Sequence, residues 1–488
     1  MADGVRSDGI RTENEQLQTD SEALSPYEVV DERIRQMESQ YDLLQYEVDG
    51  WCCWPIVRYA LQWLVAYDSR GLSVPRRFIQ HLVWAIKDIP SLIVPRKVHY
   101  IVKTYTSGLV EQEGRFYKDV WFDDLIQELG PCFKIETINN PNFIPRRKAA
   151  LVTSDLTSHA FHLVAGALAH GSGPSYIPEI ASRMHACIKS EFRAEVFSSR
   201  WIVLRLRYFY WLKKLYSGLL KRVRPAYLLT AGAGEQPLIA AAKEQGIKVI
   251  ELQHGFVDRH HSCYSWTDYA VKYKARMPIP DSFFLFGEHW KRELDTNGFW
   301  GETLRVVGSP QMDQYRRRKV GPRPAEICVL LLSTGSTTSK STIIFISEFL
   351  KAAQGKLDLY LYIKLHPVSE WSKEPYLDVF HNDPRVEILL GSEAPSTLEL
   401  LTRVHFHLSV CSTCHYDALG LGVPTVILPL ASHEIVLPLY QAGHAFLAQN
   451  PHDLLTLLLR QKDHQISEEI GRYYFKSGAL ENMKNELS

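Results

Sequence analysis

The sequence lacks an excess of charge of either sign and has no long apolar run. Lysine plus arginine and aspartate plus glutamate number 55 each in 488 residues, so the formal net charge is zero. A general nucleic-acid binder carries a basic excess, so no nucleic-acid partner is expected. No apolar stretch reaches the roughly 20 residues of a membrane span. Residues 1–20 also lack the basic and apolar regions of a signal peptide, and together these absences predict a cytoplasmic protein.

The sequence also lacks a complete metal-binding pattern. Cys411 and Cys414 form a single CxxC, with no second cysteine pair or suitably spaced histidine pair to complete a zinc site. His254, His260 and His261 lie close together, but no carboxylate or cysteine joins them at a ligand-like spacing. We therefore expect no metal site and no cofactor.

The length of the chain predicts two domains with an additional segment. A change of pattern near residues 321–324, GPRP, indicates the boundary between the domains. The expected parts are a disordered tail over 1–25, a helical N-terminal segment over 26–98, Rossmann-like domains over 99–320 and 321–465, and a C-terminal helix or tail over 466–488.

Strand and helix patterns alternate in both halves, which predicts an α/β fold with two doubly wound parallel sheets. A helix is expected over about 117–129 and another over about 342–353. In the first half strands are expected at 99–104, 149–152, 226–230, 248–252, 282–286 and 304–307. In the second half they are expected at 327–332, 359–365, 386–390, 406–410 and 424–428.

Two segments combine apolar or aromatic residues with basic ones. For residues 75–97 a helix packed on the N-terminal domain is favoured over a membrane-surface helix. Residues 201–224 suit a membrane surface or a lipid-linked acceptor, and equally suit a domain helix whose basic groups reach water. Peripheral contact with the inner face of the membrane is therefore among the expected properties.

Polar clusters follow several of the predicted strands, at 232–235, 253–255, 333–336, 364–367 and 412–415. In open parallel sheets ligands bind at the carboxyl ends of strands, where the first turns of helices offer unpaired backbone amides. The clusters therefore predict a phosphate-bearing ligand held between the two sheets.

The clusters of the second half are the candidate donor-binding groups. A lysine and a histidine at a strand end can hold a diphosphate without a metal and neutralise the phosphate as it departs. The alternatives are a strand-end histidine before a helix-starting proline, and ordinary hydroxyl caps of helices. The candidates are Ser333, Thr334, Gly335, Ser336, Lys364, His366, Pro367, Ser412 and Thr413.

The cluster at the end of the 248–252 strand supplies the candidate acceptor or cleft residues. Gln253 is polar, and Gly255 allows the backbone to turn or to approach a ligand closely. Arg259 follows a few residues later. The alternative is a polar loop in which Arg259 is simply solvated.

Five segments of the chain carry a family resemblance. They are LQHG (252–255), FLFGEHWKREL (284–294), VVGSP (306–310), KLHP (364–367) and SVCSTCHYDALGLGVPTVIL (409–428). Together they resemble the GT-B glycosyltransferases of bacterial capsule and lipopolysaccharide assembly, over roughly residues 100–458. The HP pair at 366–367 is also similar to that of bacterial sialyl- and Kdo-transferases and of CDP-glycerol phosphotransferases.

The resemblance implies a metal-independent transferase with its nucleotide-sugar donor, CMP- or UDP-linked, in the C-terminal domain. The acceptor, a surface polysaccharide or its lipid-linked precursor, would lie in the N-terminal domain. His366, Ser412 and Thr413 would then bind the donor phosphate, and Gly335 and Ser336 would contact phosphate or ribose. The chain departs from the sialyltransferase pattern, since Ser412-Thr413 replaces paired serines and no acidic-acidic-glycine motif is present.

An inverting transferase needs a carboxylate or histidine to take the proton of the acceptor hydroxyl. Glu235 is the first candidate, followed by Asp155 and His254. The alternative for Glu235 is an acidic residue in the first turn of a helix, where the helix dipole favours it. Three other functions remain open: a CDP-glycerol-type phosphotransferase, a UDP-sugar 2-epimerase, and a catalytically inactive GT-B-like nucleotide-binding subunit.

Overall fold

The computed structural model describes most of the chain between residues 26 and 487. The expected tail over 1–25, most of the 75–97 segment, the 321–324 boundary and Pro367 lie outside the described residues. The described residues are 26–67, 86, 88, 91, 96–112, 116–139, 147–192, 198–232, 234–318, 327–366, 370, 372–390 and 395–487.

A seven-stranded sheet forms the N-terminal domain, and all of its neighbouring strands are parallel. The spatial order is β11-β10-β9-β8-β3-β6-β7, so the chain changes direction across the sheet between β3 and β8. The strands are β3 (Tyr100–Tyr105), β6 (Cys132–Thr137), β7 (Leu156–Thr157), β8 (Tyr227–Thr230), β9 (Lys248–Leu252), β10 (Ser282–Leu285) and β11 (Leu304–Val306).

Helices cover both faces of this sheet because its strands are apolar on both sides. Successive residues of β3 show the alternation: Ile101 belongs to the core under α8, α10 and α11, and Val102 to the core under α6 and α21. These helices are α6 (Asp123–Leu129), α8 (His159–Gly171), α10 (Ser199–Val223), α11 (Gln236–Lys243) and α21 (Ala479–Leu487).

Further helices flank this domain, and a small hairpin packs among them. The hairpin pairs β1 (Glu47–Val48) with β2 (Trp51–Cys52), and its turn residues Asp49 and Gly50 have φ of 54° and 82°, as a tight hairpin turn requires. The flanking helices are α2 (Pro26–Gln40), α3 (Trp54–Tyr67), α9 (Ile177–Phe192), α12 (Glu288–Leu294) and α13 (Pro310–Arg317), with 3₁₀ turns at Leu43–Gln45, Thr106–Gly108, Asp268–Arg276 and Gly301–Thr303.

Two expectations for the first half are wrong. The helix expected from residue 117 begins only at Asp123, because 117–119 belong to β5 (Phe116–Asp119), paired antiparallel with β4 (Leu109–Gln112). The strand expected at 149–152 is a single bridge from Ala150 to Tyr117. Its place in the sheet is taken by β6 and β7, which were not predicted.

The C-terminal domain is a six-stranded parallel sheet in the order β14-β13-β12-β15-β16-β17. Helix α14 begins at Ser336, earlier than the expected residue 342, because its hydroxyl-rich first turn resembles a loop. The elements are β12 (Ile327–Leu332), β13 (Leu359–Lys364), β14 (Val386–Leu389), β15 (Phe406–Ser409), β16 (Thr425–Ile427), β17 (Phe446–Leu447), α14 (Ser336–Ala353), α15 (Glu374–Phe380), α16 (Thr397–Leu401), α17 (Cys414–Gly420), α18 (Leu437–Gln441), α19 (Pro451–Arg460) and a 3₁₀ turn at His433–Val436.

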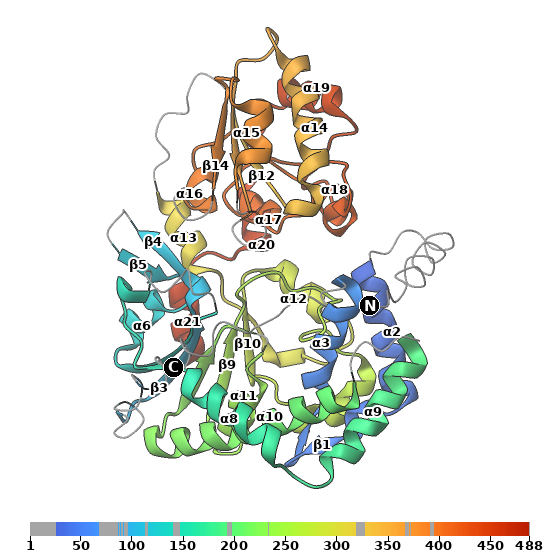
Figure 1. Ribbon diagram of the computed structural model, residues 1–488. Coiled ribbons are helices and arrows are strands. Elements are labelled where there is room, and N and C mark those ends of the chain that lie inside the picture. The colour runs from blue at the N-terminus through green and yellow to red at the C-terminus, as the bar shows by residue number, and fades with distance from the viewer. Residues whose placement is uncertain are drawn as a thin grey trace.

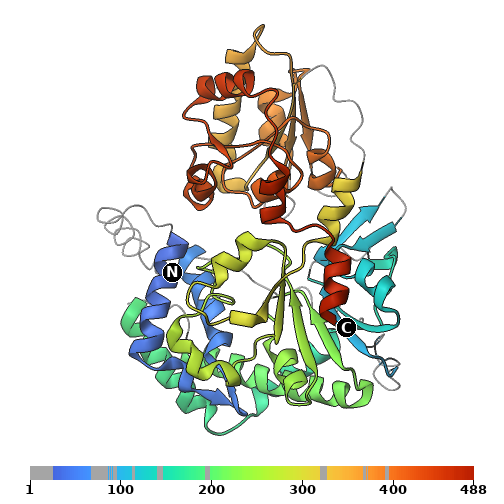
Figure 2. The same ribbon diagram turned by 180° about the vertical axis from the view of Figure 1, so that it is seen from behind.

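The chain finally returns from the C-terminal domain to the N-terminal domain. Helix α20 (Glu468–Tyr474) lies beside α12 and α17, and α21 packs its Met483 and Leu487 into the core beneath the first sheet. Figures 1 and 2 show the two domains one above the other, with α21 lying in the N-terminal domain. The second sheet has the 3-2-1-4-5-6 order of the Rossmann fold, and the first sheet has the same order with a seventh strand, β11, added at one edge. The predicted fold, two Rossmann-like domains with additional N-terminal helices, is confirmed.

Candidate functional site

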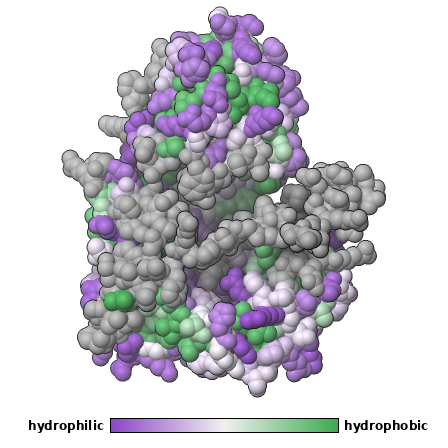
Figure 3. All heavy atoms as spheres, in the orientation of Figure 1, coloured by the Kyte–Doolittle hydropathy of each residue, from purple (hydrophilic) through white to green (hydrophobic). Residues whose placement is uncertain are grey.

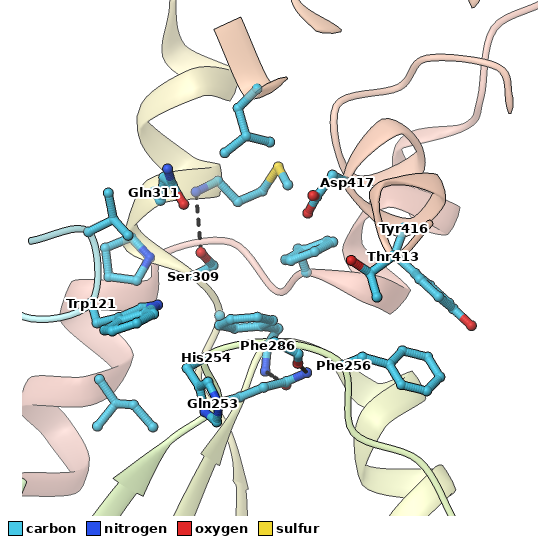
Figure 4. Close-up of a pocket in the computed structure, with 18 of the residues that line it drawn as sticks. Trp121, Gln253, His254, Phe256, Phe286, Ser309, Gln311, Thr413, Tyr416 and Asp417 are labelled. Atoms are coloured by element: carbon cyan, nitrogen blue, oxygen red, sulfur yellow. Dashed lines mark hydrogen bonds between the residues drawn. The ribbon is translucent and has the colours of Figure 1, made fainter. Parts of the chain in front are cut away.

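A cavity of about 330 Å³ lies between the two domains. It sits at the carboxyl ends of β9, β10 and β11, where ligands bind to open parallel sheets. Figure 4 shows side chains from both domains pointing toward one another across it. Its wall includes Trp121, Gln253, His254, Gly255, Phe256, Phe286 and Trp290 from the N-terminal domain, Ser396, Thr397, Thr413, Cys414, Tyr416 and Asp417 from the C-terminal domain, and Phe475 and Met483 from the returning chain.

His254, which follows β9, is the one of the three predicted bases that lines this cavity. Its ring meets the Trp121 indole edge to face, with centroids 6.0 Å apart. Nδ1 is shielded from water and has no hydrogen-bond partner among the described residues. Burial lowers the pKa of His254 to about 4. The imidazole is therefore neutral near pH 7 and able to accept a proton.

Two of the three predicted acceptor residues also line the cavity. Gln253 shapes the loop, because its Oε1 accepts a hydrogen bond from the Phe286 amide at 2.9 Å and its Nε2 donates to the Gly255 carbonyl at 2.9 Å. Gly255 is exposed on the cavity wall. Arg259 does not line the cavity and forms two 3.0 Å hydrogen bonds to Glu293.

Helix α17 brings a carboxylate to the cavity that the sequence reasoning missed. Asp417 lies one turn after Thr413, and both residues line the wall. Burial raises the pKa of Asp417 to about 6, although a hydrogen bond with Cys414 opposes the shift. A spacing of four residues places side chains on one face of a helix. The sequence signal that could have identified Asp417 is therefore its spacing of four residues from the predicted Thr413.

Aromatic side chains form much of the remaining wall. Phe256 and Tyr416 come from opposite domains, and their rings are 5.9 Å apart. Trp290 also meets Tyr416, at 4.8 Å. Ligand pockets combine such apolar walls with a few placed polar groups. These aromatic residues were not predicted, because their positions depend on how the two domains pack.

In the parallel sheet of the C-terminal domain the order of successive strands reverses between β12 and β15. Lys364 is the last residue of β13, which pairs with β12. Its ammonium donates a 2.6 Å hydrogen bond to the carbonyl of Pro395, next to Ser396 of the cavity wall. Lys364 is 8% exposed and has no ion pair among the described residues. Burial lowers its pKa. A buried cation without a counter-ion is costly unless an anion joins it.

The other predicted donor groups after β12 lie at the same edge of the sheet. The amide of Ser333 donates to the Lys364 carbonyl at 3.1 Å, and Thr334 is hydrogen-bonded to Cys411. Gly335, with φ of 116°, directly precedes α14 and leaves its first turn without a side-chain cap. The Ser333 hydroxyl lies 2.9 Å from that of Tyr376, so it has a partner within the domain. Of Ser336 only the backbone is described, at the start of α14.

His366 follows β13, whereas Ser412 and Thr413 follow β15; these two strands flank β12 in the sheet. The His366 amide donates a 2.8 Å hydrogen bond to Glu370, and the ring is half-buried, so its pKa is lowered. The Ser412 hydroxyl accepts a 3.2 Å hydrogen bond from the Cys414 amide. Of these three only Thr413 lines the cavity. The donor role of the whole set stays a prediction.

Glu235 lies at the carboxyl edge of the first sheet, near the point where the strand order reverses between β3 and β8, and does not line the cavity. Its carboxylate is 2.9 Å from the Lys103 ammonium and accepts a hydrogen bond from Tyr105. Burial raises the pKa of Glu235, but these two partners outweigh burial and hold it below its ordinary value. Its proposed role as a base stays a prediction.

Asp155 lies at the edge of the same sheet, also outside the cavity wall. It accepts a 2.9 Å hydrogen bond from the Lys134 amide and pairs with Arg96. Among the described residues no three histidine, cysteine or acidic side chains cluster as a metal site would require. Within that same part of the chain, no helix is long and apolar enough to cross a bilayer.

No protein-family model and no curated protein matches the sequence. Several solved structures resemble the chain at low identity. UDP-GlcNAc 2-epimerase from Neisseria meningitidis, bound to UDP-GlcNAc, is 14% identical with a TM-score of 0.47, covering 80% of this chain and 99% of its own. MurG from Acinetobacter baumannii is 10% identical with a TM-score of 0.43, covering 80% and 99%.

The calicheamicin glycosyltransferase CalG4 is 14% identical, with a TM-score of 0.45 and coverage of 80% of this chain and 97% of its own. The fold of this chain is established by the strand order of its own two sheets. It consists of two Rossmann-like domains of the GT-B type that face each other across a cavity.

Proposed function

We propose that this chain is a glycosyltransferase that moves a sugar from a nucleotide-activated donor to a glycan. The observation that carries the proposal is the cavity between the domains, whose wall joins neutral His254 to Thr413 and Asp417. A base from one domain therefore faces groups from the other, as transfer between two substrates requires.

The C-terminal domain would hold the donor. The Lys364 ammonium has no ion pair among the described residues, and the uncapped first turn of α14 lies at the same sheet edge. A cation and the amino end of a helix both favour phosphate. They would bind the diphosphate and stabilise the negative charge that grows on it as the sugar leaves.

The N-terminal domain would hold the acceptor and the base. The acceptor oxygen attacks the anomeric carbon, the bond from that carbon to the phosphate oxygen breaks, and the nucleotide leaves with the bonding electrons. The acceptor hydroxyl proton passes to the His254 imidazole. Among the three predicted bases His254 is preferred because it lines the cavity, whereas Glu235 is neutralised by Lys103.

The aromatic wall formed by Phe256, Tyr416 and Trp290 suits the apolar faces of sugar rings. We propose as acceptor a surface polysaccharide, of the capsule or O-antigen type, or its lipid-linked precursor. The reaction would take place at the inner face of the membrane and need no metal, since Lys364 supplies the positive charge.

The rival functions use the same kind of cleft but give different products. A UDP-sugar 2-epimerase inverts one carbon of the donor sugar, and a CDP-glycerol-type phosphotransferase transfers a phosphate with its alcohol. An inactive subunit binds nucleotide without turnover. No described residue favours one of these rivals over glycosyl transfer.

The test is product analysis with a panel of CMP-, UDP-, GDP- and dTDP-sugars and glycan acceptors, in excess chelator. We expect nucleotide release in step with sugar added to the acceptor. A donor recovered with an inverted carbon, or a phosphate found in the glycan, would replace the proposal by the corresponding rival. His254→Asn serves as the matched variant, since it keeps the size and polarity of the side chain but removes the base.

A further inference from the structure

Helices α8 and α10 lie side by side on the part of the N-terminal domain that is remote from the C-terminal domain (Figures 1 and 2). One side of α10 is buried, with Ile202, Phe209 and Tyr216 in the core. Its other side borders an open groove of about 360 Å³. We call this surface the α8–α10 groove; it is lined by Gly166, Ala169, His170, Trp201, Leu204, Arg205 and Tyr208.

The charged residues of the two helices that form this groove are all basic. Neither α8 nor α10 contains an aspartate or glutamate. Lys213 and Lys214 are neutralised by Asp49 and Glu244 from neighbouring elements. Arg205 is exposed and has no acidic partner among the described residues. The basic residues of α10 are Arg200, Arg205, Arg207, Lys213, Lys214, Lys221 and Arg222, followed by Arg224.

Apolar and aromatic groups accompany this charge. Trp201, Leu204 and Tyr208 are half-buried along the groove, and Val164 on α8 is 46% exposed. The Arg205 guanidinium lies over the Trp201 ring, 5.0 Å from its centroid. In Figure 3 hydrophobic residues lie beside hydrophilic ones along the lower edge, where Figure 1 places α8 and α10. Tryptophan, tyrosine and arginine together are typical of surfaces that meet lipid headgroups.

We propose that the α8–α10 groove is the surface by which this chain docks on a bilayer of anionic phospholipids. Arg205 and its basic neighbours bind the headgroup phosphates, and Trp201 and Leu204 enter the headgroup layer. The inference rests on the proposed function in one respect: docking would bring the transferase to a membrane-borne glycan. Because the groove lies away from the cavity between the domains, a bound bilayer leaves that cavity open to donor.

Two features set the expected strength of binding. The apolar face of α10 is already buried in the domain, so insertion is shallow and charge dominates. Each cation near an anionic surface contributes about fivefold to the affinity. Binding is therefore expected to be reversible and to weaken as salt rises.

The experiment is co-sedimentation of the full chain with vesicles of equal parts phosphatidylglycerol and phosphatidylcholine, compared with pure phosphatidylcholine. We expect binding to the anionic vesicles only, weakened about fivefold in Arg205→Gln and about 25-fold in Arg205→Glu. The matched control is Lys356→Glu, an exposed lysine of the C-terminal domain, which is expected to bind as the wild type does.

Equal binding of wild type and Arg205→Glu, equal binding to both vesicles, or no binding would overturn the proposal. So would an oligonucleotide that displaces the vesicles and loses affinity in the same variant, because the groove would then be a general polyanion site. Nucleotide release with a soluble acceptor separates this inference from the proposed function. Arg205→Glu should release nucleotide at the wild-type rate, whereas vesicle binding without any turnover would remove the transferase assignment alone.

Discussion

At the scale of single residues, the chemistry depends on how burial changes two titrating groups on opposite walls of one cavity. Burial lowers the pKa of His254 to about 4 and raises that of Asp417 to about 6. Both shifts favour the uncharged form, as expected where water is scarce. At pH 7 the histidine is a neutral base, and the carboxyl group is ionised but easily protonated.

The pH dependence of turnover separates these two groups. Above about pH 6 both are deprotonated, so wild-type kcat/KM should be level there and fall as Asp417 takes up a proton. In Asp417→Asn that acid limb should vanish, and kcat/KM should stay level down to roughly pH 5 because His254 remains neutral. His254→Asn should lower kcat by about 10²- to 10⁴-fold at every pH. The contrary result is an acid limb near pH 6.5 that persists in Asp417→Asn and disappears in His254→Asn. It would show that burial does not lower the pKa of His254.

Measuring the affinity for the donor nucleotide tests whether the buried Lys364 ammonium binds phosphate. Lys364→Met keeps the length of the side chain but removes its charge, so the affinity for a nucleoside diphosphate should fall about 10- to 100-fold, the contribution of a charged hydrogen bond. Calorimetry measures this, with exposed Lys356→Met as the control. If Lys364→Met binds as tightly as the wild type while His366→Ala does not, the phosphate is held by the HP pair instead.

At the scale of elements, helices α2 and α3 fix the loop that carries His254. The Gln62 side chain donates to the His260 carbonyl at 2.7 Å and accepts from the Ser262 amide at 3.1 Å. Arg58, fully buried, donates to the Ser262 carbonyl, pairs with Glu38 at 2.5 Å, and packs over Trp266. The additional N-terminal helices therefore help to support the candidate site.

Removing the Arg58 charge should destabilise the protein strongly. In Arg58→Met the Glu38 carboxylate stays buried without its partner, which costs about 3–5 kcal/mol. Chemical unfolding measures the loss. Arg183→Met, which removes an exposed guanidinium that contacts Glu179 and Tyr46, is the control and should leave the unfolding midpoint where it is. Equal midpoints for the two variants would mean that Arg58 does not fasten the loop.

Strands made of apolar runs were predictable from the sequence, and strands with buried charges were not. The strands expected at 327–332 and 248–252 coincide with β12 and β9. In contrast, β6 was missed because its Lys134 and Glu136 resemble surface residues. Both are buried, and the Lys134 ammonium is 2.7 Å from the carboxylate of Asp123 on α6, the helix that precedes β6. An ion pair between two different elements cannot be inferred from the hydrophobic pattern of one of them.

The candidate site divides in the same way. His254, Gln253 and Thr413 follow strand ends, so their approach to the cavity follows from strand order alone. Trp121 and Tyr416 line the cavity only because the two domains meet, and no local pattern encodes that meeting. Strand order also predicts Glu235 at a carboxyl edge, but its ion pair with Lys103 joins two strands and is not encoded in either local pattern.

At the scale of the whole molecule, the returning chain holds the two domains together. Its passage over the N-terminal domain requires glycine at two positions. A Cβ on Gly287 would lie 2.3 Å from the backbone of Tyr474, and one on Gly308 would lie 2.2 Å from the Lys476 carbonyl. Phe475, between these two contacts, lines the cavity. The returning chain therefore forms part of the wall of the candidate site.

Gly308→Ala should loosen this connection. The new methyl group clashes with backbone that cannot move aside, and the φ of 103° is itself unfavourable for alanine. We expect one thermal transition to separate into two in calorimetry, together with loss of turnover. Gly218→Ala, where the added carbon meets nothing within 4 Å, should behave as the wild type. A single unshifted transition in Gly308→Ala would show that the domains do not depend on this crossing.

The central claim is that both domains grip one phosphate-bearing ligand at the carboxyl edge of the second sheet. A crystal structure of the chain with a bound nucleoside diphosphate tests it most directly. We predict phosphate density beside the Lys364 ammonium and the amino end of α14. The terminal phosphate, to which the donor sugar would be attached, should face His254 across the cavity. Phosphate bound instead at Lys103 or in the α8–α10 groove, with the interdomain cavity empty, would contradict the account.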